Sequence, residues 1–260
     1  MTGSTLTLLL AGPLQSWGES SRHMTRSTLT HPSKSGVLGI LAAALGRTRG
    51  QDLSDLAALQ FGVRIDQPGQ LLTDFHTISG ASHAPLEPAM QRLPTADGGT
   101  LRRGESTKVT RRYYLADARF VAALVGDSSL LSQTWDKLAR PCFPLYLGRR
   151  SCPPALPVRL RLWPETTMNE ALTRTPWMAA DHVTRRHRET EVQLRAVIED
   201  AHDGEVFNDQ PVAPFRQSFS PRLGRHSTIT VAVPGRDSPG GQAGEPARPD
   251  THDPFDLLPG

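Results

Sequence analysis

The chain has 260 residues, 37% of them hydrophobic, and a formal net charge of +3. That length buries one good core, or one core with a small second lobe. No run approaches the ~20 apolar residues that cross a bilayer, and Cys142 and Cys152 have no histidines at the spacing of a structural zinc site. Because the N-terminus also lacks a basic leader and a cleavage site, we expect a soluble protein of the reducing cytoplasm, with no membrane partner and no cofactor.

The basic residues are mostly arginine, and the pI is about 9.2. Arginine favours planar, bidentate contacts to phosphate. A nucleic-acid partner fits this balance, although many proteins with such a pI bind none. The 22 glycines and 22 prolines predict a compact body with long irregular excursions.

The first 46 residues predict a strand, a long loop and a helix. Leu6–Ala11 is a short, uncharged apolar run that stops at a Gly-Pro pair, as a buried strand would. A helical stripe then follows Ser33 or Ser35, either of which can cap its start, and Gly46 can end it. Free N–H groups at this helix start, with Lys34 beside them, would suit a phosphate, but most helix starts bind nothing. The spacing fits neither a P-loop nor a dinucleotide fingerprint.

Periodicity predicts a short helix over Asp52–Leu59, followed by a two-stranded hairpin of Phe61–Asp66 and Leu71–Ile78. An unpatterned segment, 80–108, comes next, and two strands then cover Thr110–Leu115 and Ala118–Val125. A helix capped by Asp127 covers Ser128–Ala139, and a further strand covers Leu156–Leu162.

The segment 80–108 is too long for an ordinary loop, and loops of that length are usually functional or disordered. It carries several basic residues and an Asp-Gly-Gly sequence at 97–99 that fits a hairpin tip. Two interpretations stay open: a protruding hairpin over about 80–114, or a solvated insertion.

The pattern weakens beyond residue 162. Strand-like runs at 192–198 and 229–233 predict a smaller, β-rich lobe over 163–232. The last stretch, 233–260, is rich in Gly, Pro, Asp and Glu, so it cannot bury enough surface to order itself, and we predict a disordered tail.

Without the insertion and one strand, residues 1–162 give the order β-α-β-β-α-β. This order is the ferredoxin-like α+β arrangement, which RNA-recognition domains share. The Gly-aromatic-Gly run with which those domains usually bind RNA is absent. Any RNA contact would therefore use loops and the insertion.

Four segments, in this order, resemble one family. The chain is similar to the Cas-five family, in its CasD-type branch from type I-E CRISPR Cascade complexes, over roughly residues 6–160. The segments are Leu10–Gly18 (LAGPLQSWG), Ser33–Gly39 (SKSGVLG), Asp74–Thr77 (DFHT) and Tyr146–Pro153 (YLGRRSCP), of which the first and last are the more specific.

The resemblance implies a ferredoxin-like (RRM-like) palm over 1–162, with a long inserted β-hairpin thumb at about 80–114. It also implies a non-catalytic subunit of an antiviral ribonucleoprotein complex. Such a subunit holds the 5′ handle of the CRISPR RNA and caps the backbone filament. Its implied partners are this RNA, the backbone subunit and the large subunit, with target DNA met only through the complex.

Under this resemblance, RNA-binding residues are expected along the thumb and at one end of the palm. Trp17 could stack on a base or belong to the core, and Gln15 could bind RNA or only cap its loop. Arg149 and Arg150 could bind phosphates or brace their own loop through ion pairs. The full expected set is Gln15, Trp17, Lys34, Ser35, Arg102, Arg103, Lys108, Arg111, Arg112, Arg149 and Arg150.

The alternative function is a metal-independent endoribonuclease that processes precursor CRISPR RNA, as type I-C relatives do. That chemistry needs a base near a ribose 2′-OH and a cation for the phosphorane. His76, Lys108, Tyr113 and Tyr114 could supply such a set if they meet, although His76 could equally be structural. Asp74 and His76 share a strand face, but no third ligand is evident, so no metal site is predicted. We predict holding rather than cutting.

Overall fold

The computed structural model describes residues 3–18, 25–79, 99, 107–212 and 219–236. Its strands are β1 (Ser4–Ala11), β2 (Leu14–Gln15), β3 (Thr25–Arg26), β4 (Gln60–Gln67), β5 (Gln70–Ser79), β6 (Thr107–Ala116), β7 (Arg119–Gly126), β8 (Arg159–Trp163), β9 (Glu191–Glu199), β10 (Glu205–Pro211) and β11 (Phe219–Ala232). Its helices are α1 (Lys34–Leu45), α2 (Ser54–Ala57), α3 (Ser128–Ala139), α4 (Met168–Arg174) and α5 (Asp181–Thr184). None of these helices is long and apolar enough to cross a membrane.

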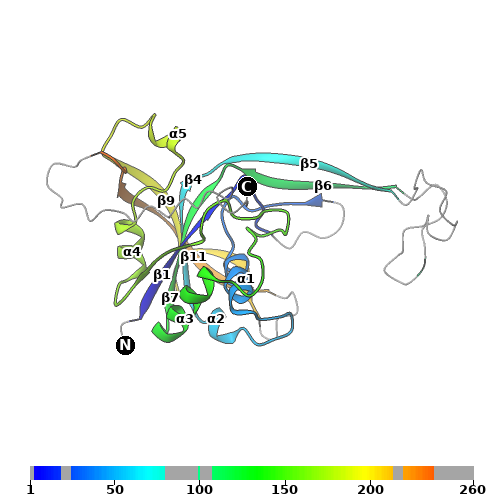
Figure 1. Ribbon diagram of the computed structural model, residues 1–260, viewed down its shortest axis with the longest axis horizontal. Coiled ribbons are helices and arrows are strands. Elements are labelled where there is room, and N and C mark those ends of the chain that lie inside the picture. The colour runs from blue at the N-terminus through cyan, green and yellow to red at the C-terminus, as the bar shows by residue number, and fades with distance from the viewer. Residues whose placement is uncertain (1–2, 19–24, 80–98, 100–106, 213–218, 237–260) are drawn as a thin grey trace, which may run out of the picture.

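The body is built on a seven-stranded antiparallel sheet in the order β10-β11-β9-β4-β7-β1-β8 (Figure 1). Alternate residues of β1, such as Leu8, face a core that α1 and α3 complete. The other face of the sheet packs on α4, where Val121 of β7 meets Leu172. Every residue of β1 is therefore buried, which explains why its sequence is an apolar run rather than an alternation. The mixed α+β class is confirmed.

Local sequence fixes the ends of the two main helices as predicted. Ser33 caps α1 by accepting a hydrogen bond from the Gly36 N–H at 3.2 Å, and Gly46 ends it with φ of 78°. Asp127 caps α3 by accepting from the Leu130 N–H at 2.8 Å. Both caps satisfy N–H groups that a helix leaves without a partner.

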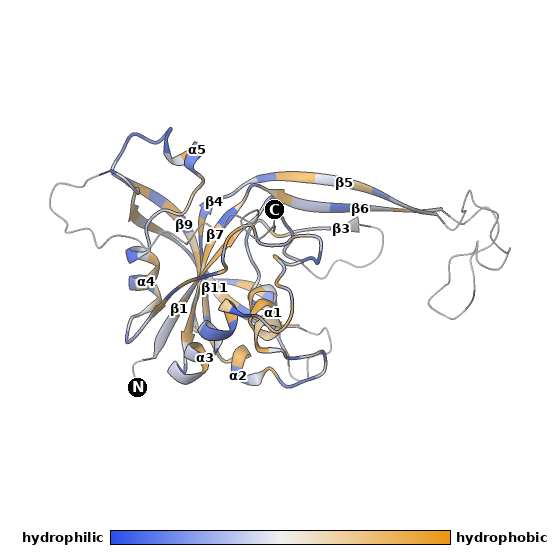
Figure 2. Ribbon diagram, viewed as in Figure 1, coloured by the Kyte–Doolittle hydropathy of each residue, from blue (hydrophilic) through white to orange (hydrophobic). Residues whose placement is uncertain are grey.

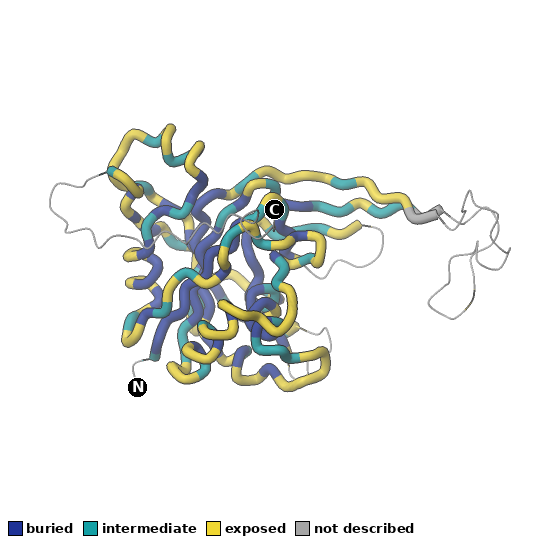
Figure 3. Tube along the Cα trace, viewed as in Figure 1, coloured by how far each residue is buried: buried dark blue, intermediate teal, exposed yellow. Residues whose placement is uncertain are grey.

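The predicted pairing of 61–66 with 71–78 is wrong. β4 lies between β7 and β9 in the large sheet, whereas β5 pairs with β6 in unbroken register from Gln70↔Ala116 to Ser79↔Thr107. β4 is buried along seven of its eight residues, and the large sheet covers both its edges, while β5 is mostly exposed (Figure 3). β5 and β6 therefore leave the body together as a long hairpin, with β2 and β3 beside β6. Most of the segment between them, 80–98 and 100–106, lies outside the described residues.

The strands within 163–232 extend the large sheet instead of forming a sheet of their own. β9 pairs with β4 through Gly62↔Ile198, and β11 and β10 continue outward from β9. The sequence pattern of 163–232 could not show this because the pairing joins residues more than 130 positions apart. The predicted tail falls mainly on 237–260, outside the described residues.

Candidate nucleic-acid interface

The loops that carry the first and last family-like segments clasp each other at the root of the hairpin. The Ser16 N–H donates to the Leu147 carbonyl at 3.1 Å. Gly148 follows with φ of 87°, and a Cβ there would lie 1.8 Å from the Ser16 carbonyl oxygen. Only glycine tolerates both this backbone conformation and this approach. The Gly-Arg-Arg sequence is therefore held in a fixed position against the first loop.

Gln15 and Trp17 support this clasp from inside. Both side chains are fully buried. The Gln15 amide donates to the carbonyls of Leu10 at 3.0 Å and Ala118 at 2.7 Å, and its oxygen accepts from the Trp17 indole at 3.1 Å. In this conformation the indole offers no exposed face on which a base could stack, so we do not propose that role. Gln15 fits the alternative of a residue that fixes its loop.

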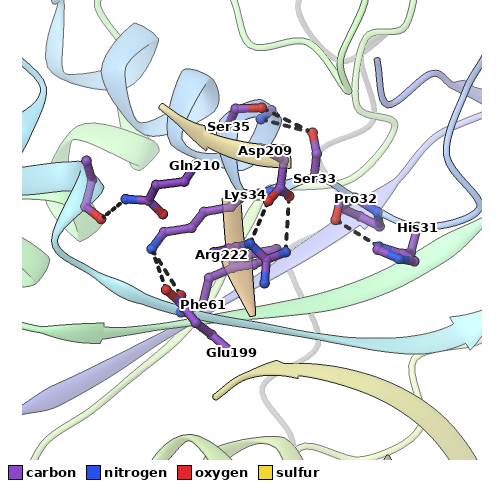
Figure 4. Close-up of polar contacts among 12 residues, drawn as sticks. His31, Pro32, Ser33, Lys34, Ser35, Phe61, Glu199, Asp209, Gln210 and Arg222 are labelled. Carbon is purple, nitrogen blue, oxygen red and sulfur yellow. Dashed lines mark hydrogen bonds and ion pairs between the residues drawn. The ribbon is translucent and has the colours of Figure 1, made fainter. Parts of the chain in front are cut away.

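The start of α1 is already occupied by carboxylates of the chain itself (Figure 4). The Lys34 backbone N–H donates to Asp209 of β10 at 2.7 Å, and the Lys34 ammonium binds Glu199 of β9 at 3.0 Å. Arg222 of β11 binds the same Asp209 at 2.6 Å. Burial lowers the pKa of Lys34, and Glu199 opposes that shift. The anion predicted at this helix start is thus Asp209, and Lys34, 1% exposed, is not available to a phosphate.

Ser35 is half-buried, and its hydroxyl lies 3.4 Å from that of Ser33. It therefore belongs to the capped end of α1 rather than to the clasp.

Arg149 braces three segments of chain. Its guanidinium donates to the carbonyls of Tyr113 at 3.3 Å, Arg26 at 2.9 Å and Ser27 at 3.4 Å. It also lies over the Tyr114 ring, 4.9 Å from the centroid. Arg149 therefore braces its loop, one of the two expected roles, but it does so through backbone carbonyls instead of carboxylates. Among the described residues no carboxylate neutralises its positive charge. Arg150 is exposed and makes no hydrogen bond or ion pair with the described residues.

Of the remaining expected residues, those that the structure describes lie on β6. Arg111 is exposed and Arg112 is half-buried in β6, and neither makes an ion pair within the described ranges. Lys108 belongs to β6 by its backbone, while Arg102 and Arg103 lie outside the described residues. Arg26, which β3 places beside Arg112, was not among the residues expected from the sequence. Its only sequence signal was a basic residue in the first loop.

Among the described members of the proposed nuclease set, His76, Tyr113 and Tyr114 do not share a site, and the Lys108 side chain lies outside what the structure describes. His76 binds Asp74, with Nδ1 and Oδ2 2.8 Å apart. Direct partners in an antiparallel pair share a face, so the His76↔Thr110 pairing puts Tyr113 on the opposite face of the hairpin. Tyr114 is 4% exposed. Among the described residues, no three His, Cys, Asp or Glu side chains form a metal cluster.

His31, beside the start of α1, predicts a pH dependence of stability. It is 6% exposed and faces Asp209, Arg222 and His226, and burial is the main reason why its pKa lies below the ordinary 6.5. The unfolded chain then binds more protons than the folded one below pH 6.5, so stability rises with pH through this window and is lost as pH falls. The slope contributed by this group reaches at most about 1.4 kcal/mol per pH unit.

The comparison of wild type with His31→Asn in urea unfolding at pH 5 to 7.5 measures this contribution. We expect the stability difference between the two proteins to change in favour of the variant below pH 6.5. A difference that is constant across the range would contradict the prediction.

Comparisons with known proteins agree with the resemblance. The family model described as CRISPR-associated protein (Cas_Cas5) matches residues 5–231. The CRISPR system Cascade subunit CasD of Escherichia coli (strain K12) is 37% identical over 172 residues, which cover 60% of this chain and 70% of that protein. A chain of a solved CRISPR RNA-guided surveillance complex is 35% identical with a TM-score of 0.70, covering 90% of this chain and 95% of that one. A solved Cas protein is 36% identical with a TM-score of 0.64, covering 86% and 94%. The chain therefore belongs to the CRISPR-associated Cas5 family.

Proposed function

We propose that this protein is a non-catalytic CRISPR RNA-binding subunit of a type I-E Cascade complex. It holds the 5′ handle of the RNA and caps the backbone filament in antiviral defence. The observation that carries the proposal is the group of arginines fixed at the root of the β5–β6 hairpin. The similarity to a Cascade subunit and to a chain of a surveillance complex supports it.

The arginines at this root come from separate segments and keep their charge available. Arg112 lies on β6, and Arg149 and Arg150 lie on the clasped loop, whose position Gly148 fixes. None of the three makes an ion pair within the part of the chain that the structure describes. Unneutralised arginines on a rigid support suit phosphates because little side-chain entropy is lost on binding and counterions are released.

The architecture fits a palm with a thumb. The elements β1, α1, β4, β7, α3 and β8 come in this order along the chain, with β2, β3, α2, β5 and β6 between some of them. Their strands lie in the order β4-β7-β1-β8. That order, with both helices on one face, is the one expected of a ferredoxin-like palm. The β5–β6 hairpin, inserted between β4 and β7, would be the thumb, and β9 to β11 would widen the palm.

The partners that follow from this proposal are the CRISPR RNA, a backbone subunit next to the thumb and a large subunit that reads target DNA. Target DNA would be met only through the assembled complex. We propose a cytoplasmic location on the same basis.

The first test is a binding titration with 5′-labelled CRISPR repeat RNA in EDTA, read on native and denaturing gels. We expect intact RNA that shifts only when the 5′ handle is present. Arg150→Ala should weaken binding about tenfold, the effect of one lost charged hydrogen bond. It should also reduce the salt slope by about 0.7, the value for one phosphate on a single strand.

The matched control is Arg185→Ala. Arg185 follows α5, and its side chain is 81% exposed. α5 lies across the body from the outer part of β5 and β6 (Figure 1). This substitution should leave binding unchanged. Binding that ignores the handle would contradict the proposal. RNA cut at one position, with cleavage abolished by His76→Ala, would establish the nuclease alternative instead.

A further inference from the structure

The register of β5 and β6 gives the hairpin two chemically different faces. Since residues directly opposite share a face and neighbours alternate, the pairings His76↔Thr110 and Phe75↔Arg111 assign every position. We call one side the cationic face; its described positions are Gln70, Leu72, Asp74, His76, Thr110, Arg112, Tyr114 and Ala116. We call the other the apolar face; its described positions are Leu71, Thr73, Phe75, Thr77, Val109, Arg111, Tyr113 and Leu115.

The root of the hairpin continues the cationic face. β3 pairs in parallel with β6 and places Arg26 directly beside Arg112. Arg149 lies over Tyr114, which lies on this face near the root of the hairpin. A line of positive side chains therefore runs outward from Arg149 through Arg26 to Arg112.

Asp74 is the one carboxylate among the described positions of this face. It lies opposite Arg112 in the register but binds His76 at 2.8 Å. Within the part of the chain that the structure describes, Arg112 pairs with no carboxylate and its buried Nε has no hydrogen-bond partner. The Thr110 hydroxyl, two residues along on the same face, is also buried and has no partner among those residues. Buried polar groups are nearly always satisfied, so neighbouring orphaned atoms indicate that a polar ligand with acceptor oxygens completes this face.

The apolar face has the opposite character. Leu71 is 65% exposed and Phe75 is 60% exposed. Figure 2 shows hydrophobic residues along the part of β5 that extends from the body. Arg111 is the one charged residue among its described positions. A strand of phosphates on this face would desolvate these apolar groups, and Arg111 is the one cation there that could pair with it.

We propose, building on the proposed function, that the RNA lies along the cationic face alone. Arg112, Thr110 and Arg149 contact its phosphate and ribose oxygens, and Arg111 does not touch it. Arg111 and Arg112 are chain neighbours on the same strand with the same charge, so the sequence alone predicts the same role for both. The sheet register places them on opposite faces and so gives them different roles.

The test compares Arg112→Gln with Arg111→Gln in the full chain, by salt titration with the 5′-handle RNA. Both variants remove one charge from nearly the same place, so long-range attraction changes equally. We expect Arg112→Gln to weaken binding about tenfold and to lower the salt slope by about 0.7. Arg111→Gln should stay within about twofold of wild type.

A second pair guards against a folding defect in the half-buried Arg112 variant. His76 and Thr77 are adjacent, exposed and on opposite faces. His76→Glu should weaken binding strongly by repelling phosphate, and Thr77→Glu should not. Equal losses in either pair, or a larger loss on the apolar face, would overturn the face assignment while leaving the proposed function intact. Failure of the wild type to select handle RNA would overturn both.

Discussion

Arg64→Ala is expected to lower the free energy of unfolding by about 3–5 kcal/mol, because it leaves a buried carboxylate without its partner. Arg64 and Asp66 of β4 form an ion pair at 2.7 Å with both side chains 0% exposed. The same guanidinium donates to the carbonyls of Leu172, Thr175 and Pro176, which fixes the end of α4 against the sheet. Urea unfolding followed by circular dichroism measures the change.

The chain offers a matched control for this prediction. Arg47 and Asp55 form the same kind of pair at 2.5 Å, but their side chains are 23% and 44% exposed. Water screens that pair, so Arg47→Ala should cost less than about 1 kcal/mol. Equal losses at the two sites would show that burial does not control the strength of these pairs.

Trp17→Ala is the second change with a large expected effect, about 3–5 kcal/mol from the cavity that a fully buried tryptophan leaves. The indole packs against Gly36 of α1, where a Cβ would lie 2.9 Å from the ring. Its loss also removes the hydrogen bond to Gln15. Thermal unfolding and RNA titration should be measured on the same preparation.

Trp17→Phe distinguishes a structural role from a binding role. Phenylalanine keeps most of the buried ring, so we expect a smaller loss of stability and unchanged RNA affinity. A variant that folds with wild-type stability but loses RNA binding would show that a base reaches this side chain. The LAGPLQSWG segment contacts the loop of Arg149 and Arg150 through Ser16, so we expect its main role to be the support of that loop.

Sequence alone was sufficient wherever a few neighbouring residues decide the outcome. The cap of α1 at Ser33, its end at Gly46 and the cap of α3 at Asp127 are contacts within one helical turn. The buried strand β1 follows from an uncharged apolar run. Four short segments also indicated the family, and the family model matches residues 5–231.

Tertiary structure alone decided which distant residues meet. From the sequence, a lysine at a helix start such as Lys34 is expected to be exposed. It is buried because Glu199 and Asp209, on strands more than 160 positions away in the chain, bind it. β4 and β5 are neighbours in the chain but belong to different sheets. Arg111 and Arg112 are chain neighbours that lie on opposite faces of the hairpin, and their faces depend on the strand register across a long insertion. All three outcomes have the same physical reason. Burial and strand pairing depend on contacts with residues that are far away in the sequence, so a local sequence pattern cannot reveal them.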